Sequence, residues 1–91
     1  MNFNEIEKTI AVAYHLKDRE TITNILSDLN QNKSKLDRWF DKYIDMFDGR
    51  MNTSERSDPV WKLYFQKFNL YSDLNHSIKT ANYFMEKLKH V

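Results

Sequence analysis

The sequence predicts an all-α protein in which a short N-terminal helix packs on a long antiparallel helical hairpin, giving a bundle of three to five helices. Three observations lead to this class. Apolar residues recur at spacings of three and four along most of the chain. Gly and Pro, which mark turns, occur once each. A length of 91 residues suits one domain, so residues 1–91 are expected to form a single helical domain.

The first helix is expected at about residues 4–17. One face of this segment is apolar at helical spacing, through Phe3, Ile6, Ile10, Ala13 and Tyr14. Asn4 is a suitable N-cap, and Glu7, three residues later, is its expected partner in a capping box.

The second helical region is expected at about residues 20–48. Four apolar residues stand seven apart and keep one phase: Ile22, Leu29, Leu36 and Tyr43. Between them lies "NQNKSK", which is rich in poor helix formers that could cap a new helix. The region is therefore either one long helix or two helices that meet near residue 31. Gly49 favours a helix C-cap, and residues 49–58 are expected to form a loop.

The last helix is expected at about residues 59–89. Asp58 followed by Pro59 is a strong start signal, because an acid can cap the helix and proline suits its first position. Apolar residues then keep helical spacing to the end: Trp61, Tyr64, Phe68, Tyr71, Leu74, Ile78, Ala81, Met85 and Leu88. The polar stretch "YSDLNHS" could interrupt this helix.

The two long stripes agree in register if the segments form an antiparallel hairpin. The expected opposite pairs include Leu29 with Ile78, Leu36 with Tyr71, and Phe40 with Phe68. The first helix is short and can cover only the aliphatic half of such a hairpin. The other half carries more large apolar residues than a two-helix seam uses, so part of this area is expected to be exposed. A compact four- or five-helix bundle that buries these rings is the alternative.

The segment "TITNILSDLNQNKSKLDRWF" at residues 21–40 resembles a helix-turn-helix. Its apolar spacing, the turn residue Asn30 and the capping residue Asn32 carry the resemblance. The resemblance implies a recognition helix that contacts DNA through Lys33, Lys35 and Arg38. An acidic ridge on the same segment opposes groove binding, and it consists of Asp37, Asp41, Asp45 and Asp48.

Composition argues against catalysis. The chain has no Cys, a net charge of +1 and one Gly, so thiolate chemistry and a glycine-rich phosphate loop are not expected. His76 beside Asp73, Ser72 and Ser77 implies no oxyanion donor or pocket, and Glu86 with His90 makes a poor metal site. We expect no enzyme activity, no cofactor and no metal. The N-terminus lacks signal-peptide features, which favours a cytoplasmic location.

The sequence therefore predicts a small interaction module that acts as an adaptor, inhibitor or regulatory subunit. Its composition fits a phage or bacterial regulator. The expected partner is another protein or a second copy in a homodimer, and no membrane is involved. The contact residues are expected to be Trp39, Tyr43, Phe47, Trp61, Tyr64, Phe65 and Phe68. The alternative function is a dimeric DNA-binding regulator of the helix-turn-helix type.

Overall fold

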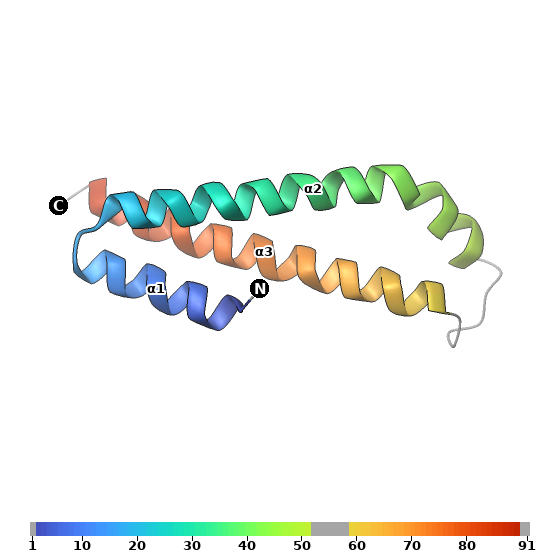
Figure 1. Cartoon of the computed structure of the whole chain (residues 1–91), viewed down its shortest axis with the longest axis horizontal. Coiled ribbons are helices and arrows are strands. Elements are labelled where there is room, and N and C mark those ends of the chain that lie inside the picture. Colours follow the sequence, from blue (N-terminus) through green and yellow to red (C-terminus); the bar gives the residue numbers. More distant parts are fainter. Residues whose placement is uncertain (1, 52–58, 90–91) are drawn as a thin grey trace.

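The computed structural model describes the backbone of residues 2–51 and 59–89, and the side chains of these residues except 45–51 and 60. This part of the chain contains three helices, α1 (Phe3–His15), α2 (Arg19–Met51) and α3 (Pro59–Lys89), and no strand (Figure 1). The all-α class is confirmed. The molecule is elongated, at 54 × 21 × 17 Å. Within the described residues, none of the helices has the length and apolarity needed to span a lipid bilayer.

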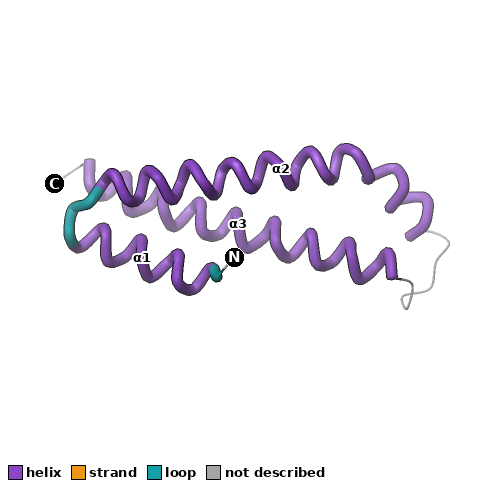
Figure 2. The backbone as a smooth tube through the Cα atoms, viewed as in Figure 1, coloured by secondary structure: helices purple, strands orange, loops and turns teal. Residues whose placement is uncertain are grey.

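Helix α2 runs antiparallel to α3 along most of the molecule, and α1 lies beside only one end of this pair (Figure 2). That end holds the described buried core. One cluster joins the three helices through Ile10, Ala13, Ile22, Ala81 and Leu88, and a second joins α2 to α3 through Leu29, Leu36 and Leu74. Phe3 and Ile6 of α1 pack against the second cluster, so the N-terminal end of α1 lies beside that cluster.

Helix α1 begins one residue earlier than expected, and its cap differs. Asn2, not Asn4, is the N-cap, and its side-chain oxygen accepts a hydrogen bond of 3.2 Å from the backbone N–H of Glu5. Glu7 takes no part in a capping box and instead lies 3.2 Å from Nε2 of His76 on α3. The prediction placed the cap too late because Phe3 and Ile6 both pack inward, which requires helix from Phe3 onward.

Helix α1 ends at His15, two residues before the expected end, in a tight connection to α2. The N–H of Asp18 donates to the carbonyl of Ala13 at 2.8 Å, and that of Lys17 to the carbonyl of Tyr14 at 3.0 Å. These two bonds form a Schellman motif, in which the residue after the C-cap is left-handed. That residue is Lys17, with φ of 56°. Glycine adopts this conformation without the steric cost that a Cβ imposes.

Replacing Lys17 with glycine is therefore expected to stabilise the protein by about 0.5 to 1 kcal/mol, or roughly 2 to 8 °C in Tm. The gain in the left-handed region exceeds the entropy that glycine adds to the unfolded chain. Thermal unfolding followed by circular dichroism measures it. Lys17→Ala is the matched control, since it removes the same charge but keeps the Cβ. Equal stabilisation by both variants would contradict the steric explanation.

Helix α2 starts at a cap that the sequence analysis did not identify. Asp18 accepts hydrogen bonds from the hydroxyl of Thr21 at 2.6 Å and from its backbone N–H at 3.1 Å. These bonds, the hydroxyl contribution being the larger, hold the pKa of Asp18 below its ordinary value of 3.8. Arg19, the first residue of the helix, donates from Nη2 to the carbonyl of Leu88 in the last turn of α3. The cap and this contact together fix the start of α2 against the end of α3.

The Asp18 cap is expected to make stability depend on pH. Because the folded pKa is depressed, the stabilisation is present at neutral pH and is lost as the pH falls below 3.8. Asp18→Asn keeps a capping oxygen but cannot titrate. The Tm advantage of the wild type over this variant at pH 7 should shrink on acidification through that range. A difference that stays constant down to pH 2 would show that the carboxylate charge is not responsible.

Helix α2 is continuous through residue 31, which settles the alternative between one helix and two in favour of one. The polar stretch stays helical because Leu29 and Leu36, on either side of it, are buried on the same face, and packing outweighs weak propensity. The side chain of Asn32 donates to the carbonyl of Asp28 at 2.9 Å, within the helix, instead of capping a new one. The helix-turn-helix interpretation of residues 21–40 is therefore wrong.

The end of α2 differs from the prediction, whereas the start of α3 agrees with it. Gly49 lies inside α2, which runs on to Met51, so residues 49–51 are helical and not loop. The rest of the expected loop, 52–58, lies outside the described residues. Helix α3 begins at Pro59 and continues through "YSDLNHS" without interruption. Leu74 and Ser77 within that stretch are buried, which explains why its polar composition does not break the helix.

Candidate interaction surface

The half of the hairpin that α1 does not cover has no buried side chain among the residues described. Among the side chains described, Leu36 is the last buried one on α2 and Leu74 is the first on α3. We call residues 37–44 of α2 with residues 61–73 of α3 the aromatic end. Two helices alone cannot enclose a core as wide as the one under α1. The large side chains described here are therefore partly accessible to solvent.

The rings of the aromatic end form one connected network. On α2 the ring of Trp39 lies 5.3 Å from that of Phe40 and 5.2 Å from that of Tyr43. On α3 Tyr64 stacks on Phe68 at 6.3 Å. Phe40 joins the helices, with its ring 6.2 Å from Tyr64 and 6.0 Å from Tyr71 in edge-to-face geometry. Such ring pairs stabilise each other by about 0.5 to 1.5 kcal/mol beyond the area they bury.

The expected pairing of Phe40 with Phe68 is not what the structure shows. Phe40 lies between Tyr64 and Tyr71, which stand two turns apart on the seam. Phe68 lies between them in sequence and, at 100° per residue, is rotated by about 40° from Tyr64 and about 60° from Tyr71 around the helix. Its side chain is turned to the outside of α3 and is 51% exposed.

Four large apolar side chains are exposed at the aromatic end. They are Ile44 at 48%, Leu63 at 40%, Phe65 at 48% and Phe68 at 51%. Single exposed apolar residues are common on protein surfaces and need no explanation. Phe65 and Phe68 differ because both contact Tyr64, and Phe65 also stacks on Trp61 at 5.6 Å, so they form a patch. Aromatic patches of this kind are typical of protein–protein interfaces.

Lysines surround the rings of this half of the hairpin. The Nζ of Lys33 lies 5.6 Å from the ring centre of Tyr71, that of Lys42 lies 5.3 Å from Tyr43, and that of Lys67 lies 5.2 Å from Trp39. Ammonium groups at this distance from a ring face are held by cation–π attraction of about 0.5 to 1 kcal/mol each at exposed sites. Three rings of this half of the hairpin therefore each have an ammonium group over them.

The structure brings most of the predicted contact residues together. Trp39 and Tyr43 on α2 and four residues of α3 belong to the ring network: Trp61, Tyr64, Phe65 and Phe68. The side chain of Phe47 lies outside the described residues. The predicted DNA contacts Lys33, Lys35 and Arg38 all lie on α2, which has no turn before them. Lys33 instead contacts Tyr71.

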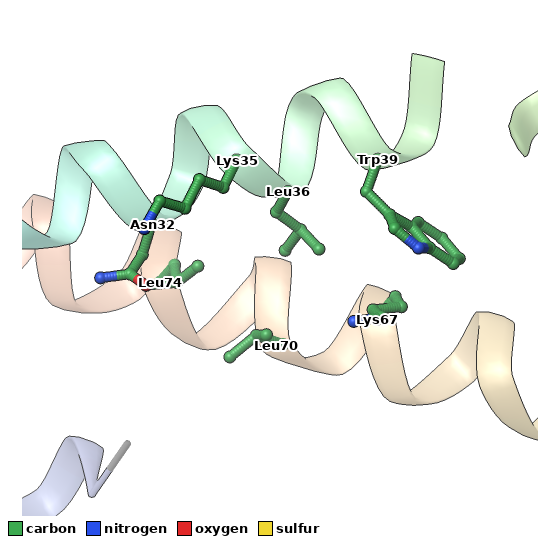
Figure 3. Close-up of a pocket in the computed structure, with 7 residues that line it drawn as sticks. All are labelled: Asn32, Lys35, Leu36, Trp39, Lys67, Leu70 and Leu74. Carbon is green, nitrogen blue, oxygen red and sulfur yellow. The ribbon is translucent and has the colours of Figure 1, made fainter. Parts of the chain in front are cut away.

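A groove that overlaps the aromatic end is lined by Trp39, a predicted partner contact, and by Lys35, a predicted DNA contact, together with residues predicted as neither. It has a volume of about 440 Å³ and lies between α2 and α3 (Figure 3). Trp39 and Leu36 line it from α2, and Lys67 and Leu70 line it from α3. The spacing of Leu70 was the signal that could have identified it as a groove residue. Leu70 stands seven residues before buried Ser77, and this heptad interval places both residues on one flank of α3.

The polar candidates for chemistry do not converge. Ser77 is buried, whereas the side chain of its neighbour His76 is 74% exposed and pairs with Glu7. His90, the proposed partner of Glu86, lies outside the described residues. No group of three or more potential metal ligands is found among the side chains that the structure describes.

Comparisons with protein-family models, with curated proteins and with solved structures found no match.

Proposed function

We propose that this protein is a non-enzymatic interaction module that docks onto a protein partner through its aromatic end. The observation that carries the proposal is the exposed patch of Phe65 and Phe68, stacked against Trp61 and Tyr64. Trp and Tyr are enriched among the residues that contribute most binding energy at interfaces, and Phe is enriched in interfaces as a whole. The cytoplasmic location and the role of adaptor, inhibitor or regulatory subunit expected from the sequence are part of this proposal.

The geometry supports docking because the rings are already arranged in the free chain. Phe65 and Phe68 sit on a regular helix and are braced by neighbours at 5.6 to 6.3 Å. A preorganised aromatic surface loses little conformational entropy on binding, so more of the gain from burial is retained as affinity. The partner is another chain or a second copy of this one.

The test compares two double variants. Phe65→Ala with Phe68→Ala removes the patch, and Val12→Ala with Leu16→Ala removes two exposed apolar side chains from α1, where they are 58% and 72% exposed. Light scattering over a range of concentrations measures self-association. Affinity capture with the wild-type chain, followed by titration of the captured partner, measures binding to another protein.

We expect the patch variant to weaken association by about 30-fold or more, since two central aromatic residues typically cost at least 2 kcal/mol together. The control variant should change it by less than about threefold, and each variant should remain folded with a stability loss of about 2 kcal/mol or less. Trp61→Ala should likewise weaken association more than folding. If each patch substitution lowers stability as much as binding, the rings are ordinary core and the proposal fails.

A further inference from the structure

The groove lies on the same side of the hairpin as α1 and extends along the hairpin beyond the N-terminal end of α1. On α3, Leu70 in the groove and Phe84 under α1 are fourteen residues apart, which places them on one flank of the helix. Phe84 contacts Tyr14 of α1, with ring centres 4.8 Å apart. Leu36 and Leu74, which line the groove, belong to the cluster on which Phe3 of α1 packs. The groove therefore begins where α1 does and runs away from it.

The uncovered length suits a second short helix. Helix α1 has 13 residues and spans about 20 Å, whereas α3 has 31 residues and spans about 46 Å. The difference of about 27 Å leaves room for up to roughly five helical turns in line with α1. Helix α1 also shows what this flank of the hairpin holds: an amphipathic helix with apolar residues such as Ile6, Ile10 and Ala13 three or four apart facing inward.

The charge of the groove indicates which kind of helix would bind there. Its floor is apolar, through Leu36, Leu70 and Leu74, and its charged lining residues are Lys35 and Lys67 (Figure 3). Neither lysine forms an ion pair with a carboxylate within the described part of the chain. A second copy that docked the same groove symmetrically would place these lysines against their own equivalents, and like charges oppose such a contact. Carboxylates flanking an apolar stripe would neutralise them.

We propose that this groove binds an acidic amphipathic helix of a partner protein, in line with α1. The inference rests on the proposed function and names the chemistry of its partner. Apolar side chains of that helix fill the space over Leu36 and Leu70, and its carboxylates reach Lys35 and Lys67. Trp39, with Lys67 over its ring, borders both the groove and the ring network.

The experiment uses two labelled synthetic peptides of about four turns. Both carry leucines three and four residues apart, and one has glutamate where the other has lysine on the flanking positions. Fluorescence anisotropy measures the binding of each to the full chain at low and at moderate ionic strength. The protein variants are Lys35→Glu with Lys67→Glu in the groove, and Lys8→Glu with Lys79→Glu at exposed positions of α1 and of α3 beside it. The two variants have the same net charge.

The wild type and the control variant should bind the glutamate peptide at least about tenfold more tightly than the lysine peptide, with the gap narrowing as salt increases. The groove variant should reverse the preference. The inference is overturned if neither peptide binds, if both bind equally, or if the two variants respond alike. These outcomes leave the proposed function standing when association still depends on Phe65 and Phe68. The proposed function fails separately, when association is unaffected by those two residues.

Discussion

Replacing Leu74 with alanine is expected to lower the free energy of unfolding by about 2 to 5 kcal/mol, the largest effect of any substitution considered. Leu74 is 1% exposed and joins Leu29 and Leu36 in the cluster at the middle of the hairpin. The substitution removes buried apolar surface and leaves a cavity. The cavity persists because the packed clusters on either side prevent the helices from moving together. A domain of this size has only about 5 to 13 kcal/mol of stability in total.

Phe68→Ala is the informative comparison, because it removes more atoms from a nearby turn of the same helix. With its side chain 51% exposed, Phe68 should contribute about 1 kcal/mol or less. Urea unfolding followed by circular dichroism gives both values from the shift of the midpoint at constant slope. Similar losses for the two variants would mean that Phe68 is enclosed in solution, and the patch that carries the proposed function would not exist.

The contrast between Leu74 and Phe68 also shows what could be predicted from the sequence. Both residues belong to one apolar stripe, and the periodicity of that stripe correctly predicted helix for α3. Periodicity alone does not distinguish a buried position from an exposed one when the stripe is wider than the seam. The distinction depends on how much of the hairpin α1 covers. That length is set by the packing of Phe3 at one end of α1 and by the connection at Lys17 at the other.

The errors at Asn30 to Asn32 and at Gly49 are of the same kind. Local propensity marks both places as helix ends, yet α2 passes through them. At Asn32 the buried neighbours Leu29 and Leu36 supply enough packing energy to override propensity. The groove was missed for a different reason: Lys35 was predicted only as a DNA contact and Lys67 was not predicted as a contact, and the antiparallel arrangement of α2 and α3 is what brings them to one site.

Backbone amides at the aromatic end are expected to exchange with solvent about a hundredfold faster than amides beside the core. Residues 22–36 and 74–88 are packed by the buried clusters, so their amides should open mainly by global unfolding. Residues 37–44 and 61–70 have no buried side chain among those described, and can open locally. A hundredfold difference corresponds to about 2.7 kcal/mol between local and global opening.

Hydrogen exchange read by mass spectrometry or NMR measures this difference and links it to function. Phe68→Ala should accelerate exchange at the aromatic end alone, whereas Leu74→Ala should accelerate it on both sides of the cluster. A partner that covers the aromatic end should slow exchange there toward the rate of the core, because binding adds the third layer that α1 supplies elsewhere. Uniform protection along α2 and α3 in the free chain would show that the hairpin needs no such layer. The physical argument for a docking surface would then be lost.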